Sequence, residues 1–169
     1  MSKEGQIKKI EQDWAENFLE THIKFISNED REMIYNCNKA SILLFKKEYK
    51  AALRSLTFVN FKNVFYDMYS RSLMIKIYFE TNDTISVETS INNYKSFLKR
   101  EKSLADLQRS MYQNFIKYIS SLTRIKDKIN GYSEEVIASK LTAIQREMQQ
   151  EKYIADKSWL LRQVDELKK

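Results

Sequence analysis

FKKEYKAAL, residues 45–53, has the composition of a tight corner between two helices. The polar residues Lys46, Lys47 and Glu48 interrupt an apolar segment that ends at Phe45. The small and aliphatic residues that follow favour a helix again. This pattern predicts an αα-hairpin, in which one helix ends before the corner and a second begins directly after it.

The composition of the whole chain agrees with a helical fold. The 169 residues include no proline and only two glycines, whereas β-rich proteins use both residues in their turns. Hydrophobic residues make up 43% of the chain and charged residues 31%, which is typical of a globular protein and not of a disordered one. We therefore expect a single all-helical domain over residues 1–169 with short polar connections.

Other features of the sequence indicate where in the cell the protein is located. No apolar segment reaches the roughly 20 residues of a membrane span, and the charged start MSKEG does not resemble a signal peptide. These features predict a cytoplasmic protein that does not bind a membrane, and they leave the oligomeric state open. Cys37 is the single cysteine, and because it lies on an apolar helical stripe we expect a buried, unreactive thiol.

Apolar residues recur every three or four positions along almost the whole chain, which is the spacing of amphipathic helices. Six stripes are predicted before the C-terminal region: Ile7, Ile10, Trp14, Phe18, His22 and Ile26; Met33, Cys37, Ala40 and Leu44; Ala52, Leu56 and Val59; Met68, Ile75, Tyr78 and Phe79; Val87, Ile91, Tyr94 and Leu98; Leu104, Leu107, Met111, Phe115, Ile119, Leu122 and Ile129. The segments 58–66 and 73–79 contain many β-formers, but they also satisfy helical spacing and lack hairpin turns, so we interpret both as helices.

Polar residues indicate where these helices begin and end. The predicted N-caps are Asn28, Asp83 and Ser133. A long helix is expected over residues 103–130, opened by Ser103 and ended by a left-handed Asn130–Gly131. The C-terminal helical region is expected over 133–167, with a break near Tyr153.

The two hairpins of residues 33–100 resemble tetratricopeptide repeats. If Ala52 and Ser86 are equivalent small residues, the offset is 34, which is the period of that family. The same offset pairs Ala40 with Met74, Leu43 with Ile77, and Leu44 with Tyr78. The first copy departs from the family pattern at Asn36, Lys39 and Lys47, and it lacks the closing proline. The second copy fits better with one inserted residue, because Val87 suits a core better than Ser86.

A second resemblance covers most of residues 14–167. The segments FKKEYKAAL, VFYDMYSRSLMIKIYFE, YKSFLKREKSL, YQNFIKYISSL and ADKSWLLRQVDEL are similar to the C-terminal part of large uncharacterised tetratricopeptide-like proteins of Bacteroidota-type bacteria. The resemblance implies an all-α fold, a right-handed α-α superhelix of stacked hairpins closed by a longer C-terminal helical cap. It leaves open whether the chain is a piece of a longer protein, and it implies no established activity.

The resemblance also implies a role in protein–protein interaction. In such arrays the first helix of each hairpin lines a concave groove that binds a protein or peptide partner. The corresponding positions here are Cys37, Asn38, Ser41 and Phe45 in the first copy and Arg71, Ser72, Ile75 and Phe79 in the second. We expect binding at Asn38, Ser41, Arg71 and Ser72, with Arg71 suited to a carboxylate. The alternative is that these residues pack against the C-terminal helix and bind nothing.

Nucleic-acid binding is the other function that the sequence allows. The net charge is −3 over residues 1–34, +9 over 35–130 and zero over 131–169. One basic cluster lies at a predicted helix junction, with Tyr94 and Phe97 beside it: Lys95, Lys99, Arg100 and Lys102. A second lies along the long helix, near Tyr112 and Tyr118: Lys117, Arg124, Lys126 and Lys128. Such groups can contact phosphates and stack on bases, although solvated helix faces and core packing are the simpler explanation.

The sequence does not predict an enzyme. His22 is the only histidine and has no metal-ligand spacing to another residue. The acid pairs Glu29–Asp30 and Glu134–Glu135 are expected in first turns of helices, where the helix dipole favours them. Two isolated glycines cannot form a phosphate-binding loop. We therefore expect no catalysis, cofactor or metal.

Overall fold

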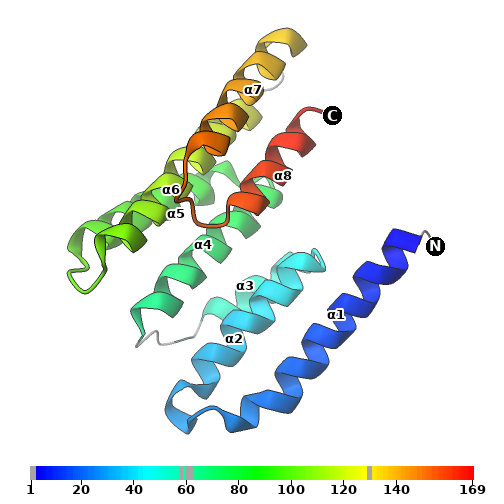
Figure 1. The fold of residues 1–169 in the computed structure, drawn as a ribbon, viewed down its shortest axis with the longest axis vertical. Coiled ribbons are helices and arrows are strands. Elements are labelled where there is room, and N and C mark those ends of the chain that lie inside the picture. Colours follow the sequence, from blue (N-terminus) through cyan, green and yellow to red (C-terminus); the bar gives the residue numbers. More distant parts are fainter. Residues whose placement is uncertain (1–2, 58, 60–62, 129–130) are drawn as a thin grey trace. The chain divides into compact units, whose positions relative to one another are not determined.

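The structure is a computed structural model that describes residues 3–57, 59, 63–128 and 131–169, with only the backbone course given before residue 13. These residues form an all-α fold (Figure 1), so the predicted fold class is confirmed at that level. The eight α-helices and one 3₁₀ helix seen in these ranges are α1 (Lys3–His22), η1 (Ile23–Phe25), α2 (Asn28–Phe45), α3 (Tyr49–Thr57), α4 (Val64–Glu80), α5 (Thr84–Arg100), α6 (Asp106–Asp127), α7 (Glu134–Gln150) and α8 (Lys157–Leu167). Within the part of the chain described, no helix combines the length and hydrophobicity needed to cross a bilayer.

The helices belong to two compact units, residues 1–82 and residues 83–169. In the first unit α1 packs on α2, and α4 packs on both members of the α2–α3 pair. In the second unit α5 packs on α6, while α6, α7 and α8 all contact one another. Packing is therefore mostly between helices that are neighbours in sequence.

The core of the first unit lies where α2, α3 and α4 meet. Its buried residues are Cys37, Ala40, Leu43, Leu44, Ala52, Leu56, Leu73 and Ile77. The predicted α2 stripe is therefore confirmed, and so is the buried cysteine. Ala40 and Ala52 are fully buried, so a larger side chain at either position would have to displace packed neighbours. Each buried leucine in this core stabilises the fold by roughly 1.5–3 kcal/mol relative to an exposed one.

The corner at residues 45–49 is a Schellman motif, which confirms the predicted hairpin. Lys47 adopts φ 62°, the left-handed conformation in which glycine is most common. Its N–H donates to the Leu44 carbonyl at 2.9 Å, and the Glu48 N–H donates to the Leu43 carbonyl at 2.8 Å. These bonds satisfy two of the last carbonyls of α2, so the chain reverses and begins α3 at Tyr49.

The core of the second unit is built around α6. Buried residues come from every helix of this unit: Val87, Ile91, Tyr94 and Leu98; Phe115, Ile119 and Leu122; Leu141 and Met148; Trp159, Leu160 and Val164. The Trp159 ring lies 6.4 Å from the Phe115 ring, centroid to centroid. The Ala155 N–H also donates to the Met111 carbonyl at 3.1 Å. These contacts fix α8 and the segment before it against α6.

Several predicted boundaries need correction. Ser27, and not Asn28, is the N-cap of α2, accepting a hydrogen bond from the Asp30 N–H. The third helix ends at Thr57, so the helix predicted over 58–66 is absent at Val59 and Asn63 and present from Val64, where α4 begins, while residues 58 and 60–62 lie outside the described ranges. The caps at Asp83 and Ser133 are confirmed, as is a break near Tyr153, between α7 and α8.

The long helix also differs at both ends. It begins at Asp106 after the N-cap Ala105, three residues later than predicted from Ser103, because the buried Leu104 precedes the helix and belongs to the connection. Leu107, which belongs to the predicted apolar stripe of this helix, is exposed. The helix ends at Asp127, and Gly131 does not adopt a positive φ. Ile129 and Asn130 lie outside the described residues.

Candidate functional site

A groove of about 300 Å³ runs between α1 and α2 in the first unit. One wall consists of apolar and aromatic side chains of α1 and η1, including Trp14 and Phe18. The other wall comes from α2 and contains Asn38 and Ser41 beside the aliphatic Ile34. Two of the four predicted partner-binding residues therefore lie together in a hollow of the surface.

An aromatic row on α1 lines this groove. Trp14 and Phe18 are stacked with ring centroids 5.2 Å apart, and Phe18 and His22 are stacked at 4.0 Å. The spacing of four residues places these rings on one face of the helix. Trp14 is 65% exposed and Phe18 is 47% exposed, so the predicted stripe of this helix does not form core at these positions. Aromatic rings this exposed are common in surfaces that bind other proteins.

Charged and polar side chains connect α1 to α2. The Lys46 ammonium lies 2.7 Å from a Glu16 carboxylate oxygen, and this contact lowers the pKa of Glu16 and raises the pKa of Lys46. The Tyr35 hydroxyl donates to Glu20 at 2.6 Å, which raises the pKa of Tyr35. Surface ion pairs contribute at most about 1 kcal/mol each. These contacts nevertheless fix the register in which the aromatic row lies along α2.

The other predicted partner-binding residues are not part of this groove. The Arg71 side chain binds Asp67 of its own helix, with Nε 2.7 Å from Oδ1. Ser72 is buried, and its hydroxyl donates to the Tyr69 carbonyl at 2.8 Å. Three further positions predicted to face the groove are buried as well: Cys37, Ile75 and Phe79. Phe45 is exposed but does not line the groove between α1 and α2.

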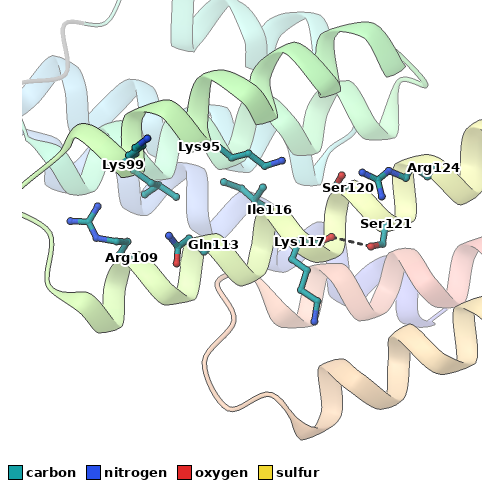
Figure 2. A pocket seen from close by; sticks show the side chains of 10 residues that line it. Lys95, Lys99, Arg109, Gln113, Ile116, Lys117, Ser120, Ser121 and Arg124 are labelled. Atoms are coloured by element: carbon teal, nitrogen blue, oxygen red, sulfur yellow. Dashed lines mark hydrogen bonds between the residues drawn. The ribbon is translucent and has the colours of Figure 1, made fainter.

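A second hollow, a cleft of about 680 Å³, lies between α5 and α6 in the second unit. Figure 2 shows the basic side chains that line it: Lys95, Lys99, Arg109, Lys117 and Arg124. Gln113, Ser120 and Ser121 add polar groups, and no acidic residue lines this cleft in the described part of the chain. We call this hollow the basic cleft.

The basic cleft unites parts of both basic clusters predicted from the sequence. Lys95 and Lys99 come from the first cluster, and Lys117 and Arg124 come from the second. Arg109 was not predicted, although its helical spacing to Gln113 and Lys117 places it on the same face of α6. Arg100 and Lys102, which were predicted with the first cluster, are exposed but do not line the cleft.

Two of the four aromatic residues near these clusters are buried, and the other two, Phe97 and Tyr112, are partly exposed. Tyr94 is 0% exposed and Tyr118 is 2% exposed. The Tyr94 ring contacts Phe97 and Tyr112, with centroid distances of 6.2 Å and 5.7 Å. These rings therefore serve the packing of α5 against α6.

Few acidic groups oppose the charge of the basic cleft. The Lys117 ammonium pairs with Glu147 of α7 at 3.2 Å, which raises the pKa of Lys117. The Arg109 side chain donates to the Glu101 carbonyl at 2.7 Å, a neutral partner that leaves its positive charge in place. Glu88 lines a smaller adjoining hollow that also contains Lys95 and Arg124. The cleft thus keeps a net positive charge.

The chain matches no known protein-family model, no curated protein sequence and no solved structure. Among the residues that the structure describes, no three His, Cys, Asp or Glu side chains lie close enough together to hold a metal ion. The class that the fold defines is an all-α protein whose eight described helices pack mostly on their sequence neighbours.

Proposed function

We propose that this chain is a non-catalytic protein-interaction module of tetratricopeptide-like type, which binds an amphipathic helix of a partner protein between α1 and α2. The observation that carries this proposal is the exposed row of stacked aromatic rings beside Asn38 and Ser41. Rings of this size contribute most of the affinity in many interfaces when a partner buries them.

Local features that recur along the chain support the repeat. Lys47 and Asn82 both adopt a positive φ, of 62° and 60°, two residues after the last residue of α2 and of α4, respectively. They are 35 residues apart, as are the buried residues Ala52 and Val87. This offset agrees with a 34-residue repeat that has one inserted residue in its second copy.

The packing within each unit supports a helix as the ligand. In the first unit α4 packs against both helices of the α2–α3 pair, and in the second unit α8 packs against both α6 and α7. A groove between two adjacent helices is thus filled by a third helix in each unit. The groove between α1 and α2 has the same kind of walls, and an amphipathic helix would bury the exposed rings there.

Asn38 and Ser41 would give this groove its polar specificity. Both side chains are half-buried on the α2 wall, and the Asn38 amide already donates to the Ile34 carbonyl at 2.8 Å. That hydrogen bond fixes the orientation of the amide. A polar side chain of the bound helix that forms a hydrogen bond with Asn38 or Ser41 would set the register of that helix in the groove.

Site-specific photo-crosslinking in the native cell tests the proposal. A benzophenone amino acid at position 18 should crosslink to a distinct partner protein, whereas the same group at Phe65, an exposed aromatic residue of α4, should not. The crosslinked peptide of the partner, identified by mass spectrometry, should have an apolar helical stripe. Equal crosslinking from both positions, or none from position 18, would contradict binding in this groove.

The affinity of the crosslinked partner segment provides a second measurement. Trp14→Ser with Phe18→Ser should weaken its binding by about 2 kcal/mol or more, which is the effect of removing interface anchors. The matched control is Phe65→Ser with Ile85→Ser, which removes two exposed apolar side chains elsewhere. Asn38→Ala should weaken binding less and without a change in melting temperature.

Nucleic-acid binding by residues 35–130 is the competing proposal, and the charge of the basic cleft favours it. The burial of Tyr94 and Tyr118 removes two of the four rings expected to stack on bases. Binding to a single strand through five phosphate contacts would show a log–log salt slope of roughly −3.5. Partner capture that disappears after nuclease treatment would favour this alternative over protein binding.

A further inference from the structure

We infer that the basic cleft between α5 and α6 is a second binding site, which takes an extended acidic peptide segment. This goes beyond the proposed groove between α1 and α2, because it involves a different unit, different residues and a different ligand chemistry. Four cations surround the cleft, Lys95 and Lys99 from α5 and Arg109 and Arg124 from α6, with Lys117 at the rim (Figure 2).

The length of the cleft fits a short extended peptide. Arg109 and Arg124 are 15 residues apart on α6, which corresponds to about 22 Å at a helical rise of ~1.5 Å per residue. An extended chain rises about 3.3 Å per residue, so about seven residues span this distance. A single phosphate or carboxylate would engage only one end of the cleft.

The spacing of the cations fits alternate side chains of such a peptide. Lys95 and Lys99 lie one turn apart on α5, which is about 6 Å along the helix axis. Residues i and i+2 of an extended chain are about 6.6 Å apart and point to the same side. Carboxylates at alternate positions would therefore reach successive cations, and the arginines could bind them in bidentate fashion.

The charge of the cleft is available to a ligand. Among the ion pairs of the described residues, only one of these five cations has a carboxylate partner: the Lys117 ammonium lies 3.2 Å from Glu147. The Lys117 side chain points toward α7 in Figure 2. Arg109 donates to a backbone carbonyl, which does not neutralise it. Glu88 lines an adjoining hollow together with Lys95 and Arg124, so acidic ligands meet a positive field that the fold compensates only in part.

The polar groups of the cleft favour a peptide over a nucleic acid. Gln113 and Ser120 provide an amide and a hydroxyl, and these groups can both donate to and accept from peptide bonds. No aromatic side chain lines the cleft in the part of the chain described, and sequence-tolerant binding of single strands depends on such rings. Phosphates alone would be held by charge without positioning of the bases.

Fluorescence anisotropy with the full chain tests the inference. The probe is a labelled heptapeptide in which Glu and Ala alternate, compared with the same peptide carrying Gln in place of Glu and with a labelled 12-nucleotide oligothymidine. The Glu peptide should bind, and the Gln peptide should bind at least about tenfold more weakly because its charges are absent. The affinity should fall as salt is raised.

Matched charge variants locate the binding. Arg109→Gln with Arg124→Gln should weaken binding of the Glu peptide about tenfold or more, because two charge-assisted contacts are lost. Lys95→Gln with Lys99→Gln provides an independent variant on α5. The control is Arg146→Gln with Arg162→Gln. It also removes two positive charges, but from exposed positions of α7 and α8 outside the cleft. Melting curves should verify that every variant is folded.

Three results would overturn the inference. These are failure of the Glu peptide to bind, equal weakening by the control variant, and tighter binding of oligothymidine that both cleft variants abolish. The last result would assign the cleft to nucleic acid. Trp14→Ser with Phe18→Ser should leave Glu-peptide binding unchanged, so the inference and the proposed groove between α1 and α2 can fail separately.

Discussion

Lys47 and Asn82 adopt the same left-handed backbone conformation, with φ values of 62° and 60°, one two residues after the end of α2 and the other two residues after the end of α4. Asparagine tolerates this conformation better than most residues, whereas lysine does not. At Lys47 the two hydrogen bonds of the Schellman motif hold the backbone in place. The corner quoted from the sequence therefore contains local strain that the rest of the hairpin offsets.

Lys47→Gly should stabilise the protein. Glycine removes the cost of about 1–2 kcal/mol that a side chain has in this conformation, while it adds roughly 0.5–1 kcal/mol of backbone entropy to the unfolded state. We expect the free energy of unfolding in urea to rise by about 0.5–1 kcal/mol. Lys50→Gly, at a helical position of α3, should instead lower it by a similar amount. Destabilisation by both variants would show that the Lys47 side chain makes a stabilising contact.

Most helices could be predicted because their apolar spacing is regular and breakers are scarce. The stripes of α2 and α5 are buried as predicted. The start of α6 was misplaced because Leu104 continues the apolar spacing although it lies in the connection before the helix. Apolar spacing indicates which residues are buried and not where a helix begins. A buried residue in a connection is therefore easily assigned to an additional turn of the helix that follows.

Ala52→Trp tests the packing of α3 against α2 and α4. Ala52 is 0% exposed within the core of the first unit, so a tryptophan there has no space. The substitution should lower the free energy of unfolding by about 1–3 kcal/mol or more, with a clear fall in melting temperature. Arg54→Trp, at an exposed position of the same helix, is the control and should change it little. An unchanged melting temperature for Ala52→Trp would mean that this helix is loosely packed.

The candidate sites could be predicted only in part. Asn38 and Ser41 lie in a groove, but the wall that completes it belongs to α1, whose apolar stripe was interpreted only as one face of an amphipathic helix. Sequence spacing shows that Trp14 and Phe18 share a face, but it does not show whether another helix covers that face. The pairing of Arg71 with Asp67 was, by contrast, accessible from their spacing of four residues.

Deletion of residues 151–169 should destabilise the second unit. This deletion removes α8, whose buried residues Trp159 and Leu160 contribute to the core around α6. The truncated chain should melt at a lower temperature and self-associate, since the apolar face of α6 becomes exposed. Light scattering and thermal melting measure both effects. A monomeric truncated chain of equal stability would show that α8 is dispensable.

Leu160→Ala provides a version of this test without truncation. Leu160 is fully buried, so the change should lower the free energy of unfolding by about 2–5 kcal/mol. Its neighbour Leu161 is only partly buried, and Leu161→Ala should have a smaller effect. Equal effects of the two variants would contradict the orientation of α8 in the structure.

Cys37 should be unreactive in the folded protein and should give stability a dependence on alkaline pH. Burial of the thiol, with a smaller contribution from Asp67, raises its pKa from 9.0 to about 12. A disulfide reagent should therefore react with Cys37 only after unfolding in urea. Rapid reaction of the native protein at neutral pH would show that the packing of α2 against α4 opens readily.

The raised pKa also makes stability depend on alkaline pH. Because the folded state holds the thiol proton more tightly, the contribution of the protonated thiol to the free energy of unfolding is complete below pH 9 and is lost as pH rises from 9 toward about 12. The free energy of unfolding should thus fall less steeply with pH in Cys37→Ala than in the wild type, since the other titrating groups are common to both.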